Sequence, residues 1–221
     1  MKKSIGIVVF SFLVMISSVA FANLNDNKAA MQNQYGDYRL IIDSDNQLWT
    51  KADWEGKGRK KARAASYMYS FSREGLRTQM EVLYNNDKPD AVVMTQRFTP
   101  DTAIKLKELK LYYPEVYALI QAPKAQFFAT HNSLSRHFQE IESPVRMGVL
   151  IRELAGNKNS AFYPLVAFNI QDEGRLIKDI ELINEDTYIK EFTIERASRT
   201  TVHDALDSNN PDWKIIKNHF H

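Results

Sequence analysis

The most concentrated chemical feature of the sequence is a run of basic side chains close to two tryptophans. Five basic residues occur within seven positions and follow both tryptophans; the set is Trp49, Trp54, Lys57, Arg59, Lys60, Lys61 and Arg63. Such side chains suit an anionic lipid head group, a glycan phosphate or an acidic protein, because charge attracts the partner and the ring adds contact area. The same run is also typical of a solvated loop that protects a sheet edge. This is the simpler interpretation, because the run has no helical face.

Five histidines offer acid–base or metal chemistry. They are His131, His137, His203, His219 and His221. The first two are six residues apart, which places them off a common helical face, and the chain lacks the His-Glu-x-x-His spacing of a zinc enzyme. The last two flank one residue at the chain end, where a metal would be poorly held. We therefore predict no metal site.

Nucleophilic catalysis has few candidates in this chain. Ser133, Ser135 and Ser160 precede His203 and Asp204, but no Gly-x-Ser-x-Gly elbow exposes a serine. Thiol chemistry is excluded because the chain has no cysteine. No glycine loop has the spacing that binds a nucleotide phosphate, so we expect no cofactor. An enzyme would have to assemble its site from residues distant in the sequence.

The first 22 residues have the pattern of a cleavable secretory signal. Lys2 and Lys3 form a positive start, residues 5–14 are almost entirely apolar, and Ala20-Phe21-Ala22 has small residues at the positions that signal peptidase recognises. The apolar stretch is too short for a membrane anchor. We expect cleavage after Ala22 and a periplasmic or secreted bacterial protein.

Removal of this segment changes the charge balance. Lys2 and Lys3 leave with it, which lowers the Lys plus Arg count from 29 to 27, equal to the Asp plus Glu count. A neutral chain argues against a protein that coats nucleic acid. No cysteine follows Ala22 to carry a lipid, and no later run of about 20 apolar residues predicts a transmembrane segment. Stability must come from an apolar core without disulfides.

Alternating apolar and polar residues indicate an antiparallel sheet. The predicted strands are residues 38–42, 47–50, 65–72, 76–84, 91–98, 162–170, 176–183 and 188–195, of which 38–50, 65–84 and 162–183 form hairpins. Helices are predicted at 99–113, where Thr99 caps and Pro100 takes the first position, and at 114–120, 124–142 and 200–206. Residues 144–156 fit either a strand or a helix, because their side chains alternate between Pro144 and Gly156.

The order of these elements predicts the fold class. Strands, then helices, then strands are typical of an α+β fold, here a single domain with a mainly antiparallel sheet and a central group of helices. We expect the signal peptide at 1–22, a flexible polar leader at 23–36 and one domain at 37–221.

Three functions fit these observations. The favoured hypothesis is a non-enzymatic exported protein that binds another macromolecule, either a protein or an anionic envelope component, as an envelope accessory, chaperone or toxin-immunity protein would. An envelope hydrolase acting on glycan, lipid or peptide is the first alternative, with His131, His137 and His203 among its acids and bases. A small-ligand carrier is the second. A pocket joining a histidine to a carboxylate would favour the hydrolase, and a closed apolar cavity the carrier.

Overall fold

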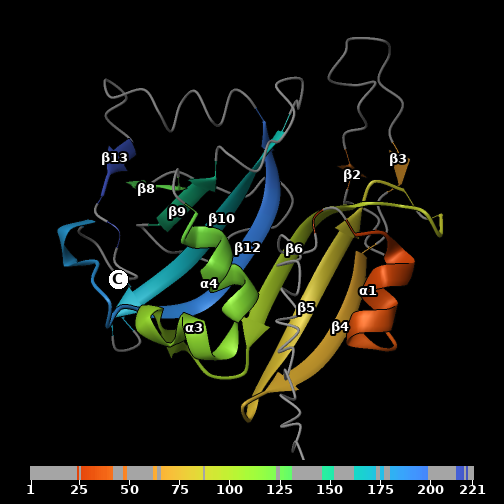
Figure 1. Cartoon of the computed structure of the whole chain (residues 1–221), viewed down its shortest axis with the longest axis horizontal. Coiled ribbons are helices and arrows are strands. Elements are labelled where there is room, and N and C mark those ends of the chain that lie inside the picture. The colour runs from red at the N-terminus through yellow and green to blue at the C-terminus, as the bar shows by residue number, and fades with distance from the viewer. Residues whose placement is uncertain are drawn as a thin grey trace, which may run out of the picture.

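A computed structural model describes the greater part of the chain. The described residues are 24, 26–41, 47–48, 62–63, 66–86, 88–122, 125–130, 146–151, 162–172, 175–176, 180–198, 213–216 and 218. Residues 1–23 all lie outside them, and with them the expected signal and its cleavage point. Figure 1 shows that the described part is built around one large, twisted sheet.

The sheet is antiparallel at every pairing between described strands. Its order is β1 (Arg39–Ile41), β4 (Ser66–Arg73), β5 (Leu76–Tyr84), β6 (Val93–Pro100), β12 (Tyr188–Ser198), β10 (Phe162–Asp172), β9 (Arg146–Ile151), β8 (Ala125–Thr130) and β13 (Trp213–Ile215). Two short strands join it at the side: β7 (Ile104–Lys105) pairs with β12, and β11 (Arg175–Leu176) with β10. A separate ladder joins β2 (Gln47–Leu48) to β3 (Ala62–Arg63).

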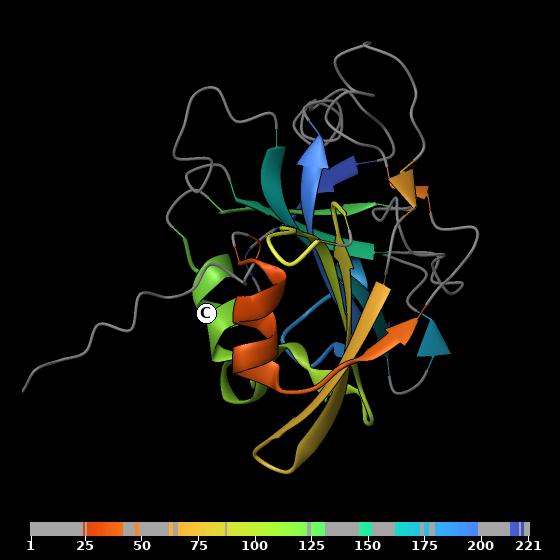
Figure 2. The ribbon, with the colours of Figure 1, turned by 90° about the vertical axis from the view of Figure 1, so that its right-hand side faces the viewer.

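The helices are short, which overturns the predicted fold class. In the described part of the chain the α-helices are α1 (Lys28–Tyr35), α3 (Leu109–Tyr112) and α4 (Pro114–Ile120), and the 3-10 turns are η1 (Leu106–Glu108) and η3 (Ile180–Leu182). They lie against one face of the sheet and form no central group (Figure 2). The prediction of an α+β fold with a central helical group is therefore wrong, and this part of the chain is closer to an all-β protein.

The misassignment arose from two segments that form strands instead. Residues 99–100, expected to begin a helix, end β6, where Thr99 pairs with Gln79 and Pro100 with Thr78. A proline is tolerated at the end of a strand, because its missing N–H group removes no hydrogen bond from the ladder there. Residues 125–130, expected to be helical, form β8, in which Phe127 and Phe128 are both buried. A strand covered on both faces has lost the alternation that identifies it.

Other expectations can be compared with the structure one by one. The β4–β5 hairpin is confirmed, and its turn at Glu74 and Gly75 has positive φ at both residues, as a two-residue hairpin turn requires. The helix at 114–120 and the strand at 188–195 are also present. The ambiguous segment contains a strand, β9. The expected helix at 200–206 lies outside the described residues.

Two of the predicted hairpins have different partners. Residues 38–42 and 47–50 do not pair with each other, because β1 pairs with β4 whereas β2 pairs with β3. In the second case, β10 pairs with the two-residue β11 only at Gln171 and Asp172, and its long partners are β9 and β12.

The face of the sheet that the helices cover, called the inner face, carries the aromatic core. The Phe192 ring stacks on Phe98 at 4.6 Å and meets the Tyr113 ring edge-on at 4.9 Å between centroids. The Tyr113 hydroxyl lies 2.7 Å from Thr78 Oγ1, and burial raises the pKa of Tyr113 to about 12 although this hydrogen bond lowers it. Contacts of this kind join α3 and α4 to the centre of the sheet.

Residues 23–36, expected to be a polar leader, include α1. Asn27 caps this helix by accepting a hydrogen bond from the Ala30 amide at 2.9 Å, and Met31 is fully buried. The chain just before α1 is also fixed, because Leu24 is buried and its carbonyl accepts a hydrogen bond from Arg196. This helix is missed by periodicity because a single buried side chain anchors it.

Candidate functional site

The basic and aromatic run identified in the sequence lies almost entirely outside the described residues. Of Trp49, Trp54, Lys57, Arg59, Lys60, Lys61 and Arg63, the structure places only Arg63, whose backbone pairs with Gln47 in the β2–β3 ladder. The ladder brings the two ends of the intervening residues together. All five histidines and the candidate serines also lie outside the described part, so the hydrolase alternative has no residue here to test it.

A different polar surface is found on the opposite side of the sheet from the helices, here called the outer face. Its side chains come from alternate positions, because successive residues of a strand point to opposite faces. The register aligns Ser70 with Gln79 and Gln79 with Thr99, across β4, β5 and β6. Two residues further along β4, and therefore on the same face, Ser72 lies opposite Arg77. Hydroxyl, amide and guanidinium groups therefore collect at one end of three strands.

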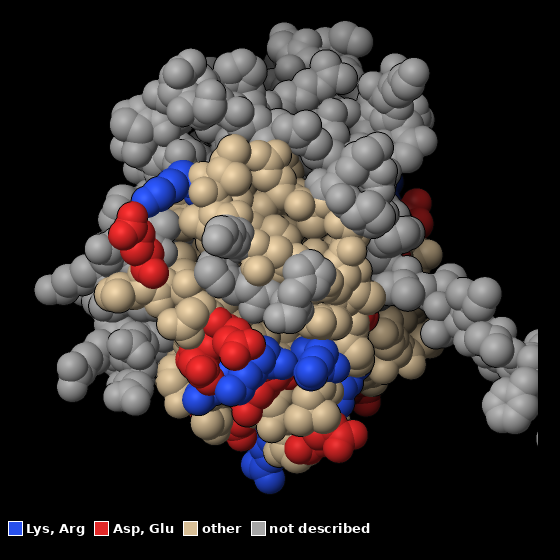
Figure 3. All heavy atoms as spheres, turned by 60° about the vertical axis from the view of Figure 1, so that its left-hand side comes forward, with Lys and Arg blue, Asp and Glu red and all other residues tan. Residues whose placement is uncertain are grey.

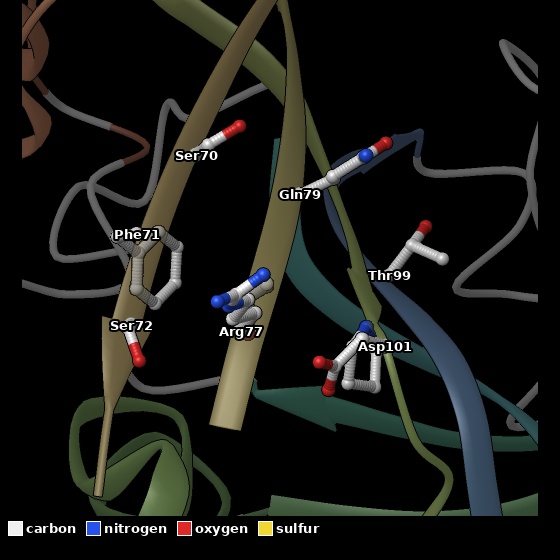
Figure 4. Close-up of a pocket in the computed structure, with 9 residues that line it drawn as sticks. Ser70, Phe71, Ser72, Arg77, Gln79, Thr99 and Asp101 are labelled. Carbon is white, nitrogen blue, oxygen red and sulfur yellow. The ribbon is translucent and has the colours of Figure 1, made fainter. Parts of the chain in front are cut away.

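This end of the outer face is hollowed into an open groove, called the outer groove. Its cavity is about 650 Å³, and it is lined by Ser70, Phe71, Ser72, Arg77, Thr78, Gln79, Thr99, Pro100 and Asp101. Figure 4 shows Arg77 between Ser72 and Asp101, with Ser70, Gln79 and Thr99 on the three neighbouring strands. The position of Asp101 is fixed by its backbone amide, which donates to the Arg77 carbonyl at 2.9 Å.

A second cavity of about 420 Å³ adjoins the outer groove toward the edge of the sheet. It is lined by Asp37, Tyr38, Arg39, Met68, Ser70 and Gln79. Ser70 and Gln79 line both cavities, so the two form one continuous hollow that reaches from β6 to β1. The segment just after α1 thus completes the site.

Next to the outer groove the same face contains a buried ion pair. Arg97 lies on β6 two residues before Thr99, and its Nε and Nη2 atoms donate to Glu191 Oε2 at 3.1 and 2.7 Å. The other carboxylate oxygen accepts a hydrogen bond from the Asn169 amide, and Glu191 is only 5% exposed. Both oxygens are therefore engaged, which a buried charge requires.

A β-bulge next to Glu191 lets Ile189 lie on the inner face while Glu191 lies on the outer face. Asn169 pairs with Glu191, but the next residue of β10 pairs with Ile189, so Lys190 is the extra residue of β12. A bulge reverses the alternation and re-aims a side chain. Without it, Glu191 and Ile189 would share a face, and Ile189 belongs to the core against the helices.

One hydroxyl beside this ion pair has no partner. Thr193 lies opposite Arg97 across the β6–β12 pairing and is 7% exposed. Among the described residues, no group accepts from or donates to its Oγ1 atom. On the neighbouring strands, by contrast, the Ser66 hydroxyl donates to Glu81. The centre of the outer face is therefore polar, buried and only partly satisfied.

Several charged side chains elsewhere on the described surface are paired. Lys105 and Lys107 contact Asp186 Oδ1 at 3.1 and 2.7 Å, and Lys214 contacts Glu181 at 2.9 Å. The hydrogen bond from Lys107, and next that from Lys105, lowers the pKa of Asp186. Figure 3 shows acidic and basic side chains adjoining one another on this side of the molecule.

The guanidinium group in the outer groove differs from these basic side chains. Within the described part of the chain, Arg77 is exposed and forms no ion pair, and the same is true of Arg39 in the adjoining cavity. Exposed donors without a fixed partner remain available to a ligand, whereas the paired lysines would first have to break a contact. The outer groove and the adjoining cavity thus each present a guanidinium group that is available to a ligand.

Both oxygens of Glu191 accept hydrogen bonds, from Arg97 and from Asn169, and these contacts hold the carboxylate in place. Searching the described residues for three or more histidine, aspartate or glutamate side chains around a common metal position finds none. A search of the same residues for a helix long and apolar enough to cross a membrane also finds none.

The sequence contains a signal for this site in the alternation of its strands, although no short motif marks it. Ser70, Arg77 and Gln79 were recognised only as the polar positions of two alternating strands. The partners Thr99 and Asp101 were assigned to a helix start, which would have pointed them elsewhere. The groove becomes visible only once β6 is known to extend to Pro100.

Comparison with known proteins adds no relative: no family model, no curated protein and no solved structure matches the chain.

Proposed function

We propose that the chain is an exported, non-enzymatic protein that binds another macromolecule of the bacterial envelope through the outer groove. One observation carries this proposal: an open hollow lined by exposed, unpaired polar groups lies on a rigid sheet beside a fully engaged buried ion pair. Groups held on strands keep their positions, so the ligand does not have to order them on binding.

The location outside the inner membrane follows from the sequence of residues 1–22, in which a positive start, a short apolar stretch and Ala20-Phe21-Ala22 form a signal pattern. A periplasmic or secreted protein meets envelope polymers directly. The continuous hollow, open along its length, suits a ligand that extends beyond the protein, as a macromolecule does.

The basic run at residues 57–63 is proposed as a second contact with the same envelope. Its residues would add charge attraction to an interaction whose shape the groove determines. Charge reversal at Lys60 and Lys61 would slow association and lessen the weakening of binding by salt if this contact forms, because the attraction that salt screens is removed.

The proposal is tested by sedimentation of the purified mature protein with envelopes isolated from its own bacterium. Arg77→Ala combined with Gln79→Ala removes a guanidinium and an amide from the groove. We expect bound protein to fall at least tenfold at subsaturating envelope. Lys110→Ala combined with Gln32→Ala is the matched control, because these exposed residues belong to α3 and α1 on the helical side.

Circular dichroism must show that both double variants remain folded. Equal sedimentation of the groove variant and the wild-type protein would contradict the proposed function, and so would a wild-type protein that does not sediment with envelopes.

A further inference from the structure

We infer that the outer groove binds a neutral glycan chain whose sugars carry vicinal hydroxyl groups. This inference rests on the proposed function and names its ligand. It is drawn from the hydrogen-bonding character, the charge balance, the position and the extent of the two adjoining cavities.

The hydrogen-bonding character of the lining matches that of a sugar. Ser70, Ser72 and Thr99 carry hydroxyl groups that donate and accept, and the Gln79 amide does both with two different atoms. Sugar hydroxyls also donate and accept, so each can be paired in either direction. Arg77 adds only donors and Asp101 only acceptors, which together serve two neighbouring hydroxyls of one ring.

The charges of the lining balance, which disfavours an ionic ligand. Arg77 and Asp101 line the outer groove, and Arg39 and Asp37 line the adjoining cavity. Each cavity thus has one positive and one negative side chain. A polyanion would meet a carboxylate in both cavities, and a polycation would meet a guanidinium in both. A neutral ligand meets neither repulsion.

The position of the hollow disfavours an added peptide strand. Extended peptides bind at a sheet edge, where backbone N–H and C=O groups are unpaired. The groove instead lies over β4, β5 and β6, whose backbones are already paired with one another. Ser70 pairs with Gln79, and Gln79 pairs with Thr99. The contacts available to a ligand are therefore those of side chains.

The extent of the hollow suits a chain of sugars. It crosses four neighbouring strands from β1 to β6, a span of about 14 Å at the usual spacing between strands. Both cavities are open, and they share Ser70 and Gln79, so a chain can pass from one to the other. A single small ligand would leave half of these groups uncontacted.

The test uses chemical treatment of the envelope, because periodate cleaves the carbon–carbon bond between vicinal hydroxyls of any such sugar. Wild-type protein is sedimented with envelopes that are untreated, oxidised with periodate and reduced with borohydride, reduced only, or digested with proteinase K. We expect periodate to lower the apparent affinity at least tenfold and the other two treatments to change it less than twofold.

Salt concentration supplies a second test. A neutral ligand in the groove predicts that 0.5 M NaCl changes the ratio of wild-type affinity to Arg77→Ala, Gln79→Ala affinity less than twofold, because salt screens charge attraction and both proteins keep the basic run at residues 57–63. A ratio that falls further in salt would overturn the inference in favour of an anionic ligand. Binding that survives periodate would overturn it, as would binding lost to proteinase K, alone or together with periodate, because the ligand would then require protein.

These failures are distinguishable from failure of the proposed function. If the Arg77→Ala, Gln79→Ala variant still loses binding to untreated envelopes while periodate has no effect, the groove binds a macromolecule that is not a glycan. If that variant binds as the wild-type protein does, the proposed function itself is wrong, whatever periodate does.

Discussion

The two faces of the central sheet are stabilised in different ways, although the same strands form both. On the inner face, Phe98 and Phe192 stack beneath Tyr113, and the contacts are almost all apolar. On the outer face of the same strands, Arg97, Glu191 and Thr193 are also buried or nearly so, but they are polar. Inner-face stability therefore depends on volume and shape, whereas outer-face stability depends on whether each polar group has its partner.

The largest loss of stability should come from removing an aromatic ring from the inner face. Phe192→Ala should lower the free energy of unfolding by about 4 kcal/mol, because it opens a cavity among three aromatic rings. Urea denaturation measures this change. Leu182→Ala is the control: this apolar residue is 56% exposed, and its loss should cost less than about 0.5 kcal/mol. Similar losses in both variants would contradict the assignment of the core.

On the outer face the largest effect should come from breaking the ion pair. Arg97→Met leaves Glu191 buried with only the Asn169 amide, and we expect a loss of about 3 kcal/mol in the same assay. Adding Glu191→Leu should restore most of that loss, because an apolar pair no longer leaves a charge without a partner. A double variant as unstable as Arg97→Met alone would show that charge is not the cause.

On β8 and β9, at the other end of the sheet, side chains of the outer face are closely packed. Gly148 pairs with Phe128, and a Cβ atom at Gly148 would lie 2.2 Å from Phe128 Cζ. Gly148→Ala should therefore cost about 2 kcal/mol through displacement of the ring. Phe128→Leu in the same chain should recover part of this cost, as thermal unfolding can show. An additive double variant would mean that the two residues do not contact each other in solution.

The smallest effects are expected at two buried threonines, one on each face. Their substitution by valine should change the free energy of unfolding in opposite directions. Thr193→Val removes an unpartnered buried hydroxyl and should stabilise the protein by about 1 kcal/mol. Thr78→Val removes a hydroxyl that is bonded to Tyr113 and should destabilise it by about 1 kcal/mol. Equal signs would indicate that Thr193 has a partner after all.

Sequence patterns were sufficient where a strand has one apolar and one polar face. The β4–β5 hairpin alternates clearly, and Gly75 marks its turn, so both were predicted. They failed where burial on both faces removes the alternation, as at Phe127 and Phe128. At Thr99-Pro100 a good helix-start signal was overridden by pairing with β5, a contact between residues 20 positions apart that local sequence does not encode.

The outer groove could not be predicted for a related reason. Its side chains come from β4, β5 and β6, and only the register decides that Ser70, Gln79 and Thr99 share a row. Likewise, Arg97 and Glu191 are 94 residues apart, and only the pairing of β6 with β12 brings the guanidinium and the carboxylate together. Motif searches look for groups close in sequence, whereas this site depends on strand order.

The Phe128 ring over Gly148 has a consequence for how the sheet assembles. A slip of two residues between β8 and β9 keeps every side chain on its own face, so alternation alone does not forbid it. Such a slip would bring Phe128 opposite Arg146 or Leu150, and each of these residues has a Cβ atom where glycine has none. Only one alignment of the two strands accepts the ring, and this pair therefore selects the native register from its nearest competitors.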